Sequence, residues 1–60
     1  MDAEVTSIIT RFEHLLATND AETAWNLQEQ FVTTYNRQPP NSEGRIALAN
    51  IWKRMMLKWH

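Results

Sequence analysis

The chain has 60 residues with no cysteine, one glycine and two prolines, and this length predicts a single domain spanning residues 1–60. Because disulfides and thiolate zinc sites are excluded, a thin core must be stabilised by well-packed helices, by a partner or by further copies of the chain. The net charge of -1 provides no overall positive field to attract nucleic acid. With 43% hydrophobic and 22% charged residues, the composition indicates a globular rather than a disordered chain.

Residues 3–17 show the periodicity of an amphipathic helix. Six apolar residues recur at helical spacing within an arc of about 120°, and these are Val5, Ile8, Ile9, Phe12, Leu15 and Leu16. Asp2 precedes them and suits an N-cap or the first turn, where an anion is favourable. We therefore expect a helix over 3–17 whose apolar stripe faces the core.

A second helix is expected over 20–36, after Thr18-Asn19-Asp20 interrupts the pattern. Asn19 and Glu22 have the spacing of a capping box. The inward residues of this helix are Ala24, Leu27, Phe31 and Tyr35, with Ala21, Trp25, Gln28 and Val32 widening one side. The resulting arc of about 160° is wider than one neighbouring helix needs. Thr33-Thr34 lowers helix propensity, so we expect a weak last turn.

Residues 37–42 form the one linker, because Pro39-Pro40 prevents the preceding residues from continuing a helix. A third helix is expected over 43–59, capped by Asn41 or Ser42. Gly44 costs about 1 kcal/mol inside a helix, which leaves open a start beyond it.

The third helix carries apolar residues on two sides. One broad face consists of Leu48, Ile51, Trp52, Met55, Met56 and Trp59. Ile46 and Leu57 lie about 20° from each other and roughly opposite that face. A single core does not easily cover both sides of one helix. Either this helix is sandwiched between neighbours, or it offers a second contact surface.

These elements predict an all-α fold: a small three-helix bundle in which 3–17 and 20–36 form an antiparallel hairpin and 43–59 packs on it. Charge divides along the chain, since residues 1–30 have a net charge of -5 and residues 31–60 a net charge of +4. This polarity favours alignment of the basic helix with the acidic half of its own chain or of a second copy. We therefore expect the bundle to self-associate.

No motif points to catalysis, a cofactor or a metal, and we expect the protein not to be an enzyme. Ser7, Thr10 and Ser42 lack the context of an activated nucleophile, and a single glycine provides no phosphate-binding loop. Glu13 and His14 are adjacent, so they point about 100° apart on a helix and do not converge on one ion.

The sequence is more typical of a small regulator that binds another protein, as a homodimer. Tryptophan, tyrosine and arginine are enriched at interface hot spots. The candidate partner-binding residues are Trp25, Ile46, Lys53, Arg54 and Leu57.

Two alternatives remain open. A DNA- or RNA-binding regulator would use the basic 43–59 helix. The 20–36 helix has Asn and Gln residues suited to contact bases, but it has no Lys or Arg to contact phosphates. A membrane-surface helix would use residues 52–59, where Trp and Lys flank the apolar run Met55-Met56-Leu57. The longest apolar run is too short to span a bilayer, and the acidic start is unlike a secretory signal. We expect a cytoplasmic protein.

Overall fold

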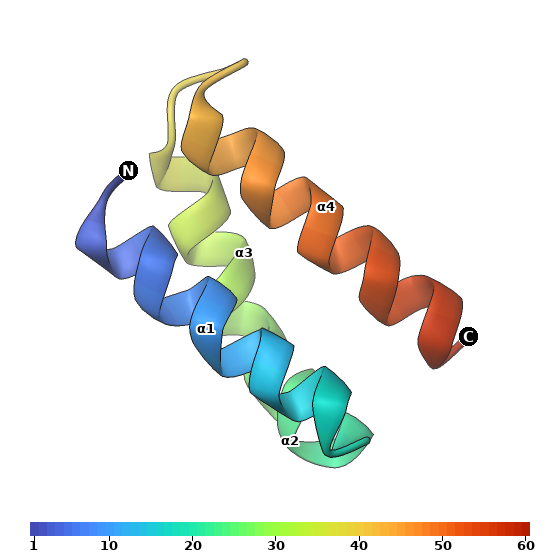
Figure 1. The fold of residues 1–60 in the computed structure, drawn as a ribbon. Coiled ribbons are helices and arrows are strands. Elements are labelled where there is room, and N and C mark those ends of the chain that lie inside the picture. The colour runs from blue at the N-terminus through green and yellow to red at the C-terminus, as the bar shows by residue number, and fades with distance from the viewer.

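The computed structural model describes all 60 residues and is all-helical, with four helices and no strand. The helices are α1 (Ala3–Ala17), α2 (Ala21–Asn26), α3 (Gln28–Arg37) and α4 (Glu43–Lys58). α1 and α4 lie side by side and run in the same direction, while α3 returns in the opposite direction and packs against both (Figure 1). The all-helical prediction is confirmed. No helix is both long enough and apolar enough to cross a membrane.

The outer helices begin where their capping residues place them. The Asp2 carboxylate accepts a hydrogen bond from the Glu4 N–H at 2.7 Å, and the Ser42 hydroxyl accepts one from the Arg45 N–H at 3.2 Å. Each satisfies an N–H group that the first turn of a helix leaves without a backbone partner. Of the two residues expected to cap the last helix, Ser42 does so.

The expected single helix over 20–36 is wrong, because the chain changes direction at Leu27. Leu27 adopts φ -96° and ψ 4°, and its N–H lies 3.1 Å from the Thr23 carbonyl and 3.2 Å from the Ala24 carbonyl. Such a shared hydrogen bond tightens the last turn of a helix. The wide apolar arc is therefore divided between two short helices. α2 buries Ala24 and α3 buries Phe31.

The residue that caps α2 is Asp20, which corrects the expectation for Asn19. The Asp20 carboxylate accepts from the Thr23 N–H at 3.1 Å and from the Thr23 hydroxyl at 2.8 Å. Asn19 instead adopts the left-handed conformation, with φ 57°, and its side-chain oxygen accepts from Trp59 Nε1 at 2.8 Å. The α1–α2 turn is thus tied to the end of α4.

The core contains the predicted stripe of α1, of which only Ile9 is partly exposed. Its ten buried hydrophobic residues are Val5, Ile8, Phe12, Leu15, Leu16, Ala24, Phe31, Leu48, Ile51 and Met55. Aromatic rings connect this core to α2: the Phe31 ring lies 5.0 Å from Phe12 and 5.2 Å from Trp52, and Trp52 lies 5.8 Å from Trp25. These contacts hold α2, α3 and α4 together at one end of the bundle.

Thr34 is buried, and the last turn of α3 is anchored by it. The Thr34 hydroxyl donates to Glu4 Oε1 at 2.9 Å, and the Arg37 guanidinium donates to the same oxygen at 2.8 Å. A second ion pair joins Arg54 to Glu13 at 3.6 Å. Both pairs connect the acidic first half of the chain with the basic second half, so part of the charge polarity is used within the fold.

α4 differs from its expected face in two respects. Met56, which was assigned to the broad apolar face, is 45% exposed. Trp59 lies beyond the last helical residue, where its N–H caps the Met55 carbonyl at 2.9 Å. Gly44 is inside the helix and buried. A Cβ there would lie 3.0 Å from Gln38 Oε1 and 3.4 Å from Val5 Cγ2, so the missing side chain lets α4 lie close to α1 and the linker.

Candidate functional site

Four exposed residues of α4 lie along the side of the helix that faces away from the core. They are Ile46, Asn50, Lys53 and Leu57, which we call the outer stripe. Their spacing places them within an arc of about 60° and over a length of about 16 Å. Ile46 is 55% exposed and Leu57 is 78% exposed, so no helix of the same chain covers the apolar ends of the stripe.

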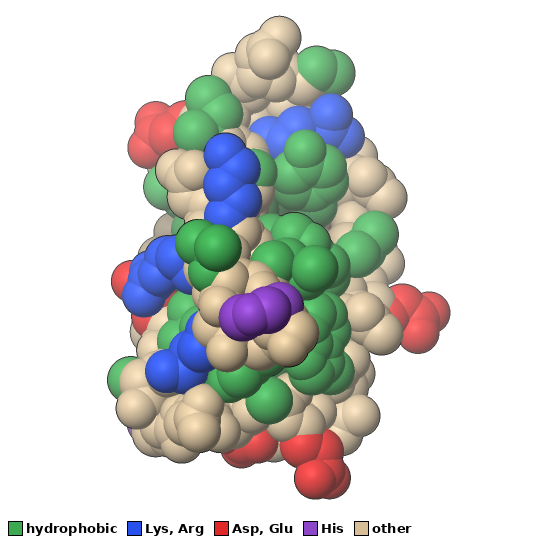
Figure 2. Space-filling model, turned by 90° about the vertical axis from the view of Figure 1, so that its right-hand side faces the viewer, with side chains coloured by type: hydrophobic (Ala, Val, Ile, Leu, Met, Phe, Trp, Pro, Cys, Tyr) green, Lys and Arg blue, Asp and Glu red, His purple; other side chains and the backbone are tan.

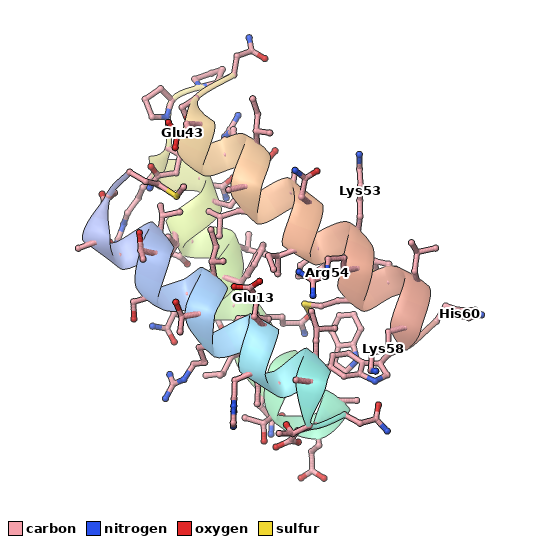
Figure 3. The ribbon with its side chains drawn as sticks, viewed as in Figure 1. Glu13, Glu43, Lys53, Arg54, Lys58 and His60 are labelled. Carbon is pink, nitrogen blue, oxygen red and sulfur yellow. The ribbon has the colours of Figure 1, made fainter.

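The structure brings together three of the five candidate residues and separates the other two. Lys53 projects away from the bundle, whereas Arg54 points toward Glu13 of α1 (Figure 3). Trp25 is half-buried on α2, where its ring meets the Trp52 ring edge-on. Ile46, Lys53 and Leu57 therefore form one surface, to which Arg54 is a neighbour and Trp25 does not belong.

A groove between α3 and α4 was not predicted. It has a volume of about 410 Å³, and five of its seven lining residues are hydrophobic. The lining consists of Phe31, Val32, Tyr35, Asn36, Ala49, Trp52 and Lys53. Ala49 is the smallest of these side chains, and its size leaves the space between the two helices unfilled. The signal in the sequence was the wide apolar arc expected for residues 20–36, whose margin includes Val32; the structure leaves Val32 44% exposed.

Charge around the groove is positive. Lys53 is the only charged lining residue. The Arg45 guanidinium lies over the Tyr35 ring, 4.5 Å from its centroid, and donates to the Tyr35 carbonyl at 3.4 Å. Figure 2, which views the molecule from the α4 side, shows hydrophobic side chains gathered in a band along this face with Lys and Arg side chains beside it. The face combines apolar contact area with cations beside it.

Titratable side chains do not converge on a reactive centre. No group of three or more His, Cys, Asp or Glu side chains is placed to hold a metal ion. The pKa of Asp20 is lowered, first by the hydrogen bond from the Thr23 hydroxyl and then by that from the Thr23 N–H. This carboxylate is a helix cap, and it lies apart from both the outer stripe and the groove.

The chain was compared with protein-family models, with curated proteins and with solved structures, and none of them matches it. Function is therefore inferred from the chain's own surfaces. The outer stripe and the α3–α4 groove are the two features of that surface with the composition of a binding site.

Proposed function

We propose that the protein is a small interaction module and regulator that associates with a second copy of itself through the outer stripe of α4. The observation that carries this proposal is the exposure of Leu57, at 78%, together with Ile46, at 55%, on one face. Scattered exposed apolar residues are ordinary on protein surfaces. These two, however, are joined by Asn50 and Lys53 at intervals of four, three and four residues, which is the repeat of a helix–helix seam.

This repeat is self-complementary when two α4 helices pack antiparallel. Placing Ile46 opposite the partner's Leu57 also places Asn50 opposite the partner's Lys53. Each end of the seam then buries an apolar pair, and in its middle the Asn50 side-chain oxygen is available to accept from the partner's ammonium group. A polar pair inside an apolar seam fixes the register of the two helices.

The charges of α4 favour the same orientation. Glu43 is in the first turn and Lys58 in the last, so an antiparallel partner brings opposite charges together at both ends. Antiparallel alignment also places the positive pole of one helix dipole near the negative pole of the other. The two Lys53 residues are offset along the helix axis by about 4.5 Å, because each faces Asn50 rather than its own equivalent.

The size of the stripe predicts a weak dimer. A standard interface buries about 800 Å² on each partner. That area is about a fifth of the 4043 Å² that the whole chain exposes, and a stripe of four residues on one helix is smaller than that. Burying four partly exposed Ile and Leu side chains contributes about 4–8 kcal/mol, part of which offsets the freedom lost on association. We expect a dissociation constant of about 10–1000 μM.

Sedimentation equilibrium from about 5 μM to about 1 mM tests the proposal. The wild-type chain should shift from monomer to dimer across this range, and Leu57→Asp should raise the dissociation constant by about tenfold or more because it buries a charge in the seam. Met56→Asp is the matched control, since Met56 is exposed but lies outside the stripe. A monomer at every concentration, or equal effects of the two variants, would contradict the proposal.

A second candidate function is nucleic-acid binding through α4. It is favoured by Lys53 and Lys58, which are exposed and make no salt bridge, beside a half-exposed Arg54. The test is titration of a labelled mixed-sequence duplex at low and moderate salt. Salt-sensitive binding that is lost in Arg54→Glu would establish this function in place of the first. No binding at low salt would remove it.

A further inference from the structure

We infer that the groove between α3 and α4 is a second binding site, whose occupant is an amphipathic helix with acidic flanks from a different protein. The site does not depend on the proposed dimer. Its lining comes mainly from α3 and from Ala49 and Trp52 of α4, and Lys53 is the one residue that it shares with the seam of Ile46, Asn50, Lys53 and Leu57. Lys53 lies on the border between the two surfaces.

The shape of the groove suits inserted side chains. Its lining includes Ala49 and the rings of Trp52 and Phe31, whose centroids are 5.2 Å apart, although Phe31 is only 2% exposed. Val32, 44% exposed, forms part of the wall on α3. Aromatic surfaces in a hollow of this kind are where anchor residues of a partner contribute most of their binding energy. The apolar side chains of a helix laid along the groove would contact these rings.

The length of the groove sets the length of the helix that fits. The lining on α3 runs from Phe31 to Asn36, which is about 9 Å of helix. A helix laid along this stretch makes contact over about two turns, through apolar residues at i and at i+3 or i+4. One short amphipathic segment is enough to fill the site.

The charges around the groove determine which kind of partner helix it favours. Lys53 lies on the rim, Arg45 covers Tyr35, and no carboxylate lines the groove. Acidic residues that flank the apolar positions of a partner helix are therefore attracted, and basic ones are repelled. The same charges disfavour the outer stripe of a second copy as the occupant, because that stripe carries Lys53.

Two matched helical peptides of 14 residues test this inference. Both carry Leu at the positions that face the groove, and they differ only in having Glu or Lys at the positions that flank these leucines. Titration into the ¹⁵N-labelled chain should show about tenfold tighter binding of the Glu peptide. The largest amide shift changes are expected at Val32, Asn36 and Ala49.

Three variants locate the site. Ala49→Leu fills the groove and should weaken the Glu peptide by about tenfold or more, whereas Leu57→Asp, on the outer stripe, should leave its affinity unchanged. Lys53→Glu substitutes an exposed side chain and should remove or reverse the preference for the Glu peptide. If Ala49→Leu fails to fold, the Lys53→Glu variant still tests the inference.

Three outcomes would overturn the inference. They are equal affinity for the two peptides, shift changes centred on Ile46 and Leu57, and no binding of either peptide up to about 1 mM. None of these outcomes depends on whether the chain sediments as a dimer. Failure of the groove site and failure of the proposed self-association are therefore distinguishable.

Discussion

Two small residues of α4, Gly44 and Ala49, have opposite effects on their surroundings. At Gly44 the neighbouring elements approach so closely that a Cβ would lie 3.4 Å from Val5 Cγ2. Ala49 instead lines the groove of about 410 Å³ between α3 and α4. On one side a small residue permits close packing, and on the other it leaves a hollow. Which result follows, close packing or a hollow, depends on what packs against that side of the helix and not on residue size alone.

The largest effect on stability is expected when the buried and exposed faces of α4 are compared. Met55 is fully buried, and its neighbour Met56 is 45% exposed. We expect Met55→Ala to lower the free energy of unfolding by about 2–5 kcal/mol, because it leaves a cavity among α1, α3 and α4. Met56→Ala should cost less than about 1 kcal/mol. Urea denaturation of the two variants measures the difference, and similar values would mean that the two faces of α4 have been misassigned.

Leucine placed at each small residue compares the two sides directly. Gly44→Leu should destabilise the fold by about 1–3 kcal/mol, because the new side chain has no space between α4 and Val5. Ala49→Leu should change stability by less than about 1 kcal/mol, since its side chain enters the groove. Thermal unfolding followed by circular dichroism distinguishes them. The contrast would fail if Ala49→Leu were the more destabilising change.

A smaller effect is expected at the far end of α3, where packing is polar. Thr34 is 1% exposed, and its hydroxyl donates to Glu4. Thr34→Val keeps the shape but removes this hydrogen bond, so the free energy of unfolding should fall by about 0.5–1.5 kcal/mol. Thr33→Val changes the exposed neighbour and serves as the control in the same urea experiment. Equal values for the two would show that the bond to Glu4 contributes nothing to stability.

The smallest effect concerns the α2 cap and appears only in acid. In the folded chain the Thr23 hydrogen bonds lower the pKa of Asp20 below its ordinary value of 3.8. The stabilisation is therefore present above that value and is lost as the pH falls through the folded pKa. Asp20→Asn retains a capping oxygen without the titration, so its melting temperature should decline less between about pH 5 and pH 2. Glu22→Gln removes a nearby carboxylate but no cap, so the melting temperature of this variant should decline as much as that of the wild type.

Local patterns in the sequence predicted the parts of the fold that depend on local physics. The stripe of α1 and the Asp2 and Ser42 caps are confirmed because periodicity and capping involve residues within a few positions of one another. The break at Leu27 was missed because neither proline nor glycine marks it. The burial of Thr34 was missed because its partner, Glu4, is 30 positions away in the sequence.

The candidate site divides in the same way. The exposure of Ile46 and Leu57 follows from their position opposite the apolar face of one helix, and this was predictable. The groove depends on how far α3 stands from α4 at Ala49, and that spacing arises only from packing. Arg54 was expected on the same surface as Lys53, but the two side chains point about 100° apart on the helix, and Arg54 pairs with Glu13 instead.

The side-by-side arrangement of α1 and α4 has a consequence for how the chain is made. At a synthesis rate of about 5–20 residues per second, the 41 residues from Thr18 to Lys58 take about 2–8 s to follow α1. During that interval the apolar stripe of α1 lacks α4, one of the helices that cover it. The outer stripe and the groove come into existence only when α4 has been synthesised. A nascent chain therefore first exposes a surface destined for its own core, and acquires its binding surfaces last.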